Sequence, residues 1–409
     1  MKIVYLNPSA QLGGAEAALF TLLSGLRRHR PDWTLELILT ETGPLASRAE
    51  AIGVRVKVLK LPERPARLGD SAAGGPAGQE LSRAGVIGRL LLSMPSLLLY
   101  VWRLGMALRA ASPDIIHTNG LKMHLLAIPA KPRGAALVWH MHDYASARPL
   151  ASFLLRRAAR FCTAAATNSK SVASDLRNLC GDELNIVPIY NAVDLERFNP
   201  EGTALDLDAL AGLPAAPDGT VRVGLVATMA KWKGHGVFLE ALARLPASLP
   251  FRGYIAGGSL YPTEGSQSSP DALREDARRL GLHDRVGFTG FVEDSPALMR
   301  SLDVVVHAST RPEPFGLVIA EAMASGRPVV VSAAGGAAEI AALCAEVPVY
   351  PPGDVSGLAG LIEQLVSDRK KREAVGRDGR VCAERFFDHS RFSEEFSGFY
   401  ESVSPEKDS

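Results

Sequence analysis

The sequence predicts an α/β fold in which parallel strands alternate with helices in two successive domains. The chain has 409 residues, which is enough for two hydrophobic cores. Short β-branched runs, such as the one at 329–331, are typical of strands that are buried on both faces of a parallel sheet. Residues 194–220 are rich in Pro, Gly and Asp, and we expect them to link the two domains.

In the first domain, apolar runs that end in polar or glycine-containing turns mark the strands. We expect these strands at residues 3–7, 35–40, 54–59, 136–139, 164–168 and 186–190, with a strand and turn at 114–120. A helical pattern at 15–26 repeats leucine on one face. Gly13 and Gly14 precede it and let a ligand approach the main chain closely, although such turns also carry glycine for packing.

Two histidines follow the strand at 136–139 and are candidates for a ligand site. His140 and His142 are two residues apart, so at strand periodicity their side chains share a face. Sites in α/β proteins usually form just beyond the carboxyl ends of the strands. The alternative is a structural histidine that is hydrogen-bonded to a loop carbonyl.

The second domain begins with a cationic turn. Its strands are expected at 221–227, 252–256, 302–306 and 329–331, with a strand and turn at 286–292. After the first of them come Thr228, Lys231 and Lys233, followed by Gly234. A lysine beside a glycine at a strand–helix turn can neutralise a phosphate group. Two solvated lysines are the alternative.

Residues 307–339 carry the strongest signal for a ligand site. Helices are expected to begin after Gly316 and after Gly335 and Gly336, and free N–H groups at a helix start favour an anion such as phosphate. Glu313 and Glu321 flank this position. A carboxylate beside a phosphate is costly unless it binds something else, and sugar hydroxyls suit it. The segment therefore predicts a sugar-nucleotide site, with an ordinary strand–helix unit and a solvated Glu321 as the alternative.

Charge and composition limit the possible partners. Residues 1–190 hold 23 Lys and Arg against 13 Asp and Glu, whereas the remainder holds 22 against 31. A basic first half suggests that it faces an anionic surface or ligand. We expect no nucleic acid partner, because the sequence has no basic–aromatic interleaving. Asp206 and Asp208 form a D-x-D motif in a connector, and we interpret this match to a metal-binding signature as chance.

The most apolar stretch, residues 86–108, is too short to span a bilayer. Its apolar part between Arg89 and Arg103 covers 13 residues, against about 20 for a spanning helix, and Pro95 interrupts it. The stretch is either a buried helix or a helix that lies in a membrane interface, with Arg89, Arg103 and Arg109 at the headgroups. Residues 61–85, rich in Pro and Gly, are expected to form a mobile surface loop.

The cysteines and the N-terminus predict a cytoplasmic protein. The first residues lead directly into an apolar run at 3–6, so no secretory signal is expected. The four cysteines are scattered and form no C-x-x-C motif, which is typical of reduced thiols. They are Cys162, Cys180, Cys344 and Cys382.

Together these motifs resemble the retaining GT-B glycosyltransferases of family 4. At 307–339 the match is carried by the E-x7-E pair and its surroundings: Glu313, Pro314, Phe315, Gly316, Glu321, Ala322, Gly326, Pro328, Val329, Gly335, Gly336 and Glu339. The turn at 191–194 resembles the family's N-G-V-D, with Ala192 in place of Gly. Thr228 stands where the family usually has an arginine, and Lys231 is the residue that could compensate.

The resemblance implies two Rossmann-like domains whose parallel sheets face a cleft. They would comprise residues 1–193, with a C-terminal helix at about 386–403 packed back on them, and residues 221–385. It also implies sugar transfer from a nucleoside diphosphate sugar to a hydroxyl acceptor with retained anomeric configuration, and with neither metal nor cofactor. A sugar-nucleotide epimerase and a non-catalytic carbohydrate-binding module are the alternatives.

The resemblance further assigns roles to individual residues. His142 and Glu313 would be catalytic. The residues expected to bind the donor are Gly14, Thr228, Lys231, Lys233, Phe315, Gly316, Leu317 and Glu321. Gly13 and Asn119 would lie on the acceptor side. The acceptor is expected to be a sugar or a lipid-linked molecule in cell-surface polysaccharide, lipopolysaccharide or glycolipid synthesis, which would bring the protein to the inner face of an anionic plasma membrane.

Overall fold

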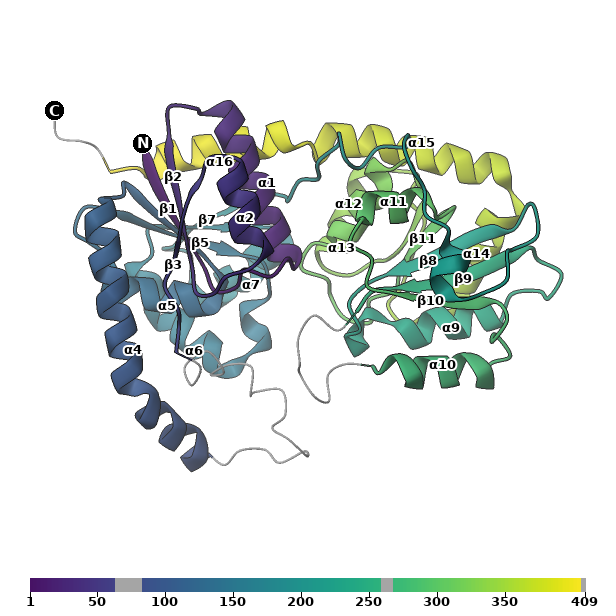
Figure 1. Cartoon of the computed structure of the whole chain (residues 1–409), viewed down its shortest axis with the longest axis horizontal. Coiled ribbons are helices and arrows are strands. Elements are labelled where there is room, and N and C mark those ends of the chain that lie inside the picture. Colours follow the sequence, from purple (N-terminus) through teal and green to yellow (C-terminus); the bar gives the residue numbers. More distant parts are fainter. Residues whose placement is uncertain (63–82, 259–267, 406–409) are drawn as a thin grey trace. The chain divides into compact units, whose positions relative to one another are not determined.

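The computed structural model describes residues 1–62, 83–258 and 268–405, and for residues 83–93 it describes the main chain alone. The chain divides into two compact units (Figure 1). Unit 1 comprises Met1–Asn191 with His389–Ser409, and unit 2 comprises Ala192–Asp388. Each unit is built on one parallel sheet with helices on both faces, which confirms the predicted fold class.

Unit 1 contains a seven-stranded sheet of order β3-β2-β1-β4-β5-β6-β7. Its strands are β1 (Lys2–Asn7), β2 (Thr34–Leu39), β3 (Arg55–Val58), β4 (Ile115–Asn119), β5 (Ala136–Met141), β6 (Ala164–Thr167) and β7 (Asn185–Pro188). The order reverses between β1 and β4. Ligands of open α/β sheets bind at such a reversal, beyond the carboxyl ends of the strands.

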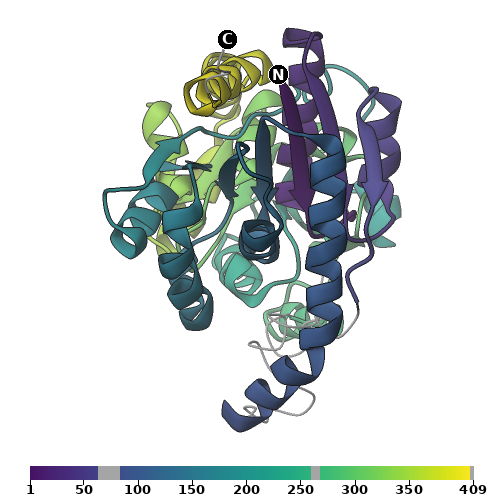
Figure 2. The ribbon, with the colours of Figure 1, turned by 90° about the vertical axis from the view of Figure 1, so that its left-hand side faces the viewer.

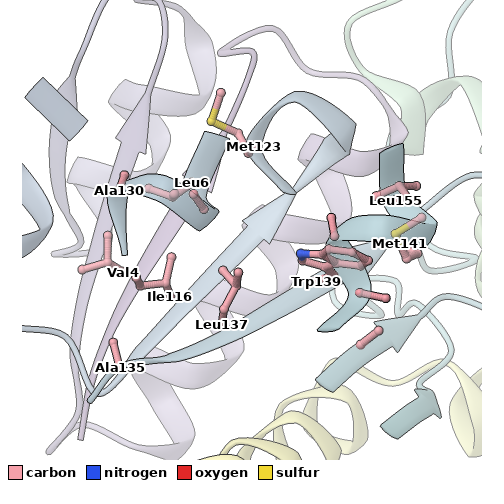
Figure 3. Packing of buried hydrophobic residues seen from close by; sticks show 14 of the residues in the cluster. Val4, Leu6, Ile116, Met123, Ala130, Ala135, Leu137, Trp139, Met141 and Leu155 are labelled. Atoms are coloured by element: carbon pink, nitrogen blue, oxygen red, sulfur yellow. The ribbon is translucent and has the colours of Figure 1, made fainter. Parts of the chain in front are cut away.

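Helices cover both faces of this sheet (Figures 1 and 2). One face carries α1 (Gly14–His29), α2 (Pro44–Ala51) and α16 (His389–Val403); the other carries α4 (Arg83–Ala111), α5 (Gly120–Ala130), α6 (Pro149–Ala158) and α7 (Lys170–Cys180). Short 3-10 turns, η2 (Ala145–Ala147) and η3 (Ala159–Phe161), flank α6. The core beneath α4 to α7 includes Val4, Leu6, Ile116, Leu137 and Trp139, which come from adjacent strands (Figure 3).

Helix α4 has one buried and one exposed apolar side, which agrees in part with the buried helix expected at 86–108. Tyr100 and Leu104 are buried in the core, whereas Leu98, Trp102 and Met106 are 61%, 60% and 51% exposed. Among the described residues, none of the helices combines the length and apolar character needed to span a bilayer. Most of the predicted mobile loop at 61–85 lies outside the described residues.

Unit 2 contains a six-stranded sheet of order β10-β9-β8-β11-β12-β13. Its strands are β8 (Val221–Val226), β9 (Phe251–Ala256), β10 (Val286–Gly290), β11 (Val304–His307), β12 (Val329–Ser332) and β13 (Val349–Tyr350). The order reverses between β8 and β11, so the segments that follow these two strands lie at the switch point. The helices are η4 (Lys231–Lys233), α8 (Leu207–Ala211), α9 (His235–Ala243), α10 (Pro270–Arg279), α11 (Ser295–Arg300), α12 (Leu317–Ala324), α13 (Gly336–Leu343), α14 (Val355–Ser367) and α15 (Arg369–Phe386).

The segment 194–220, expected to be a linker, is part of unit 2, and its two acidic residues have structural roles. Asp206 caps α8 by accepting the N–H of Ala209 at 3.0 Å. Asp208 is buried, pairs with Arg252 at 2.5 Å and accepts the hydroxyl of Tyr254 at 2.6 Å. Both carboxylates of the D-x-D motif are therefore used to hold this segment against the sheet.

The prediction of four reduced cysteines is wrong for one pair. Cys344 follows α13 and Cys382 lies in α15, and the two form a disulfide with their Cα atoms 6.0 Å apart. They are 38 residues apart in the sequence. Spacing rules could not detect a pair that only the packing of two helices brings together. Cys162 and Cys180 are free thiols.

Candidate functional site

Glu313 is the centre of the polar cluster in unit 2. It lies in the loop between β11 and α12 and is 7% exposed. Lys233 Nζ donates to both carboxylate oxygens, at 2.9 Å to Oε1 and 2.7 Å to Oε2. The hydroxyl of Ser309 donates to Oε2 at 2.7 Å, and Nε2 of His307 lies 3.2 Å from the same oxygen. Two segments of the chain, the turn at Lys233 and the end of β11, thus converge on one carboxylate.

The charge of Glu313 is fixed by these partners. Burial by itself raises the pKa of the Glu313 carboxyl, but the positive charge of Lys233 and the hydrogen bond from His307 outweigh it and hold the pKa well below its ordinary value. The carboxyl is therefore ionised throughout the neutral pH range. A buried carboxylate that stays charged can accept hydrogen bonds from ligand hydroxyls.

The main chain around Glu313 is fixed as well. The N–H of Glu313 donates to the carbonyl of Ala334 at 3.2 Å, and the N–H of Gly336 donates to the carbonyl of Glu313 at 2.7 Å. These bonds tie the loop to the start of α13. A side chain at Gly336 would place its Cβ 2.2 Å from the carbonyl oxygen of Pro314, so this contact requires glycine.

Lys233 is positioned by a tight turn after β8. Gly234 follows it with φ of 77°, and a Cβ there would meet the carbonyl oxygen of Ala308 at 1.8 Å. The Nζ of Lys233 lies 4.1 Å from the ring centroid of Trp232, a cation–π arrangement. Lys233 is thus held by Glu313 and Trp232 and is not a solvated lysine. Lys231 is exposed, and Thr228 is half-buried between β8 and η4.

Helix α12 begins at Leu317, four residues after Glu313. Gly316 caps it with φ of 98°, and no side chain caps the helix, so Leu317 opens it with main-chain N–H groups that have no intrahelical acceptor. The ring of Phe315 is buried and packs edge-on against Phe387 at 5.9 Å. Phe315 is one of the predicted donor-binding residues. Because its ring is buried, only its main chain could contact a ligand.

Glu321 lies one turn into α12 and is half-buried. Within the described ranges, its carboxyl has neither a hydrogen bond nor an ion pair. Burial raises its pKa to about 7, and the positive charge of Arg197 only partly opposes that effect. Unlike Glu313, this carboxyl changes its charge near neutral pH. Its oxygens can accept hydrogen bonds from a ligand.

In unit 1, the glycine turn stands at the end of β1. Gly13 is the N-cap of α1, which begins at Gly14. Sequence analysis missed Glu16, which is buried in the first turn of this helix and lies 3.2 Å from Nδ2 of Asn7. Burial raises the pKa of Glu16, and hydrogen bonds from Asn7 and main-chain N–H groups oppose this. An acidic residue two positions after the paired glycines was the available signal.

The two candidate histidines differ in accessibility. His140 lies within β5 and is fully buried, whereas His142 follows the end of β5 and is half-buried. Their ring centroids are 3.9 Å apart. His142 Nε2 lies 3.3 Å from Oδ1 of Asn119, which stands at the end of β4. The structure thus brings Asn119 and His142 together at the carboxyl edge of the sheet and leaves His140 beneath them.

In the part of the chain that the structure describes, no group of three or more His, Cys, Asp or Glu side chains is arranged to hold a metal ion.

Two family models match the chain in succession. The model described as Glycosyltransferase Family 4 matches residues 12–197, and the model described as Glycosyl transferases group 1 matches residues 214–381. The first match covers most of unit 1, and the second covers most of unit 2, including Lys233, Glu313 and Glu321.

Individual proteins support the same assignment. The 2-deoxystreptamine N-acetyl-D-glucosaminyltransferase of Streptomyces fradiae is 29% identical over 316 residues, 70% of this chain and 72% of that protein. The lipopolysaccharide core biosynthesis mannosyltransferase LpsB of Rhizobium meliloti is 27% identical, over 53% of this chain and 60% of its own length. Anabaena HepE, crystallised in complex with UDP-glucose, is 25% identical with a TM-score of 0.76, covering 98% of this chain and all of that one.

Replacing Lys233 by methionine should destabilise the protein, because Glu313 would keep a buried charge without its counter-ion. We expect a loss of about 2 kcal/mol in the free energy of unfolding, seen as a lower Tm in thermal denaturation. The control Lys231→Met removes an exposed lysine two residues away and should change stability by no more than about 0.5 kcal/mol. Equal melting curves for Lys233→Met and the parent protein would contradict this.

Proposed function

Because the chain belongs to the glycosyltransferases of the GT-B fold that form group 1, we propose that it moves a sugar from a nucleoside diphosphate sugar to a hydroxyl acceptor, with retained anomeric configuration. The observation that carries this proposal is the buried, ionised carboxylate of Glu313, held by Lys233 beside the start of α12. Anion-binding N–H groups and a hydroxyl-binding carboxylate at one sheet edge suit the two halves of a sugar nucleotide.

In the proposed reaction, the main task of unit 2 is to stabilise the departing diphosphate. Negative charge builds on this group as the bond from the sugar to the phosphate breaks, and the N–H groups at Gly316 and Leu317 would receive it. Lys233 can hold Glu313 and still donate to a phosphate oxygen, because an ammonium has three donors. Lys231 and Thr228 belong to the same turn and would lie near the diphosphate.

The two carboxyl groups would bind the two sugars of the donor. Glu313, permanently ionised, would accept hydroxyls of the sugar being transferred. Glu321, whose oxygens have no partner within the described residues, would accept the hydroxyls of the ribose. The crystal structure of HepE in complex with UDP-glucose supports a uridine nucleotide as the first donor class to examine.

The residues that we assign to the substrate in unit 1 lie at the carboxyl edge of its sheet. His142 is half-buried there and would contact the sugar being transferred. Gly14 would lie near the diphosphate, and Gly13 and Asn119 on the acceptor side. The oxygen of the acceptor hydroxyl would form the new glycosidic bond as the bond from the sugar to the phosphate breaks. The leaving phosphate would take the proton of that hydroxyl, so no further base is needed.

We also propose that the acceptor is lipid-linked or lies near a membrane, as in the synthesis of cell-surface polysaccharide, lipopolysaccharide or glycolipid. The apolar side of α4 exposes Leu98, Trp102 and Met106, with the exposed Arg103 and Arg109 beside them. Helix α6 and the adjoining turn η3, on the same face of the sheet, expose Leu150 and Phe153 together with three arginines, Arg156, Arg157 and Arg160. Apolar groups flanked by arginines fit the interface of an anionic bilayer, which would be the inner face of the plasma membrane. The similarity to a lipopolysaccharide mannosyltransferase agrees with this class of acceptor.

Glu313→Gln should abolish turnover while leaving the fold intact, because the amide keeps the shape but not the charge that holds the sugar hydroxyls. We expect a loss of at least about 100-fold in the rate of sugar release from the best donor in a panel of radiolabelled sugar nucleotides. Glu346→Gln, an exposed change in the same unit, is the control and should keep full activity. Turnover of Glu313→Gln within twofold of the parent would contradict the role of Glu313 in holding the sugar. No turnover of any donor by the parent would count against sugar transfer itself.

The affinity for the donor should rise with pH in a way that depends on Glu321. The raised pKa of about 7 means that this carboxyl is mostly protonated at pH 6 and mostly ionised at pH 8. Only the ionised form accepts two hydroxyls, so the dissociation constant should fall about tenfold between these pH values. Glu321→Gln should bind the donor weakly and lose this dependence in calorimetric titrations. The same pH profile in the variant would assign the titration to another group.

Membrane association should depend on the exposed side of α4. A Leu98→Ser, Trp102→Ser, Met106→Ser triple variant should lose sedimentation with vesicles that contain anionic lipid, because it removes the apolar groups that enter the interface. Val381→Ser, an exposed apolar residue of unit 2, is the control. Binding of the parent protein should weaken with salt and disappear with neutral vesicles. Unchanged binding of the triple variant would mean that a surface other than the exposed side of α4 contacts the membrane.

A further inference from the structure

A line of hydrogen bonds runs through unit 1 from the C-terminal helix to His142. The hydroxyl of Tyr400, in α16, lies 2.7 Å from Nδ1 of His117. The other ring nitrogen of His117, Nε2, lies 3.3 Å from Oδ1 of Asn119. The same oxygen lies 3.3 Å from Nε2 of His142. Tyr400 and His142, which are 258 positions apart in the sequence, are thereby joined by three successive contacts.

This line is sealed from solvent until it reaches His142. Tyr400 and His117 are fully buried, and Asn119 is almost so. The rings of Tyr5 and Phe396 lie 4.9 and 5.9 Å from that of His117. Solvent therefore cannot supply alternative partners to these groups, and the position of each hydrogen is set by its neighbour.

The position of the Asn119 oxygen determines which nitrogen of each histidine carries hydrogen. An amide oxygen can only accept, so Nε2 must carry the hydrogen on both rings that it contacts. Burial lowers the pKa of His117 to about 3 and that of His142 to about 4, so both rings are neutral and carry one hydrogen each. Nδ1 of His117 is then a lone-pair acceptor, and the hydroxyl of Tyr400 donates to it.

We propose that Tyr400 is a positioning residue that acts through His117 and Asn119 to hold His142 in the tautomer with hydrogen on Nε2. The effect on catalysis rests on the proposed contact between His142 and the substrate, whereas the tautomer itself does not. His142 would then carry its lone pair on Nδ1, a buried nitrogen that has no hydrogen-bond partner within the described residues. A substrate hydroxyl that reaches this nitrogen would find an acceptor there and not an acid.

The surrounding contacts agree with this role for α16. The main-chain carbonyl of His142 accepts a hydrogen bond from Nδ2 of Asn168 at 3.2 Å, which holds the main chain from which the ring projects. His140 packs against the ring of His142 but takes no part in the line, since neither of its nitrogens has a partner among the described residues. Helix α16 packs on α1 and lies over the strands that carry His117 and His140.

The tautomer can be measured without substrate by nitrogen NMR of the protein labelled with [15N]histidine. The signal of His142 is identified by its loss in His142→Gln. Tyr400→Phe removes the hydroxyl and keeps the ring, so Nδ1 of His117 loses its donor. His117 can then place its hydrogen on Nδ1 if the Asn119 amide turns over with it, so that Nδ2 of Asn119 donates to Nε2 of both histidines. The matched control is Tyr100→Phe, which removes another buried tyrosine hydroxyl, on the opposite face of the sheet and outside the line.

We expect the parent protein and Tyr100→Phe to show His142 with hydrogen on Nε2 alone, and Tyr400→Phe to show a mixture of both tautomers. With the best donor, Tyr400→Phe should also lower kcat about three- to tenfold, the effect of one lost hydrogen bond, and leave the donor KM unchanged. Hydrogen on Nδ1 of His142 in the parent would mean that the Asn119 amide is turned over, and it would overturn the proposal. An unchanged tautomer in Tyr400→Phe would do the same, and neither result would bear on whether the protein transfers sugars.

Discussion

The ion pair between Glu313 and Lys233 is the interaction on which the geometry of unit 2 depends. It joins the turn after β8 to the loop after β11, the two strands at which the sheet order reverses. The loop is joined in turn to the start of α13 by main-chain bonds at Glu313. A buried pair of this kind is weak support for stability but a strong constraint on geometry, because breaking it would leave an uncompensated charge. The pair therefore fixes the start of α12, where an anion would bind.

The two carboxyl groups of unit 2 illustrate how environment divides similar side chains between tasks. Glu313 is surrounded by donors and stays charged, whereas Glu321 is half-buried without a partner within the described residues and titrates near neutrality. Neither property follows from the side chain alone. The E-x7-E spacing places Glu313 in the loop before α12 and Glu321 one turn into that helix, and the surroundings of each decide whether it stays charged.

Much of the fold and part of the candidate site followed from local sequence patterns. β-branched runs between glycine turns identified the strands, and the spacing of Glu313, Gly316 and Glu321 indicated the candidate site, because the signals of each element lie within a few residues of one another. The disulfide between Cys344 and Cys382 left no comparable trace. The contact between Tyr400 and His117 joins residues that only the folded chain brings together, so no window of sequence could contain it.

Helix α16 also bears on how the protein acquires its structure during synthesis. Phe392, Phe396 and Tyr400 are fully buried in unit 1, but they leave the ribosome after every residue of unit 2. Until α16 emerges, nearly 200 further residues must be translated, and the part of the sheet face that this helix covers stays exposed during that time, so chaperones would be expected to engage it. Unit 2 is contiguous and can complete its core before unit 1 receives its last helix.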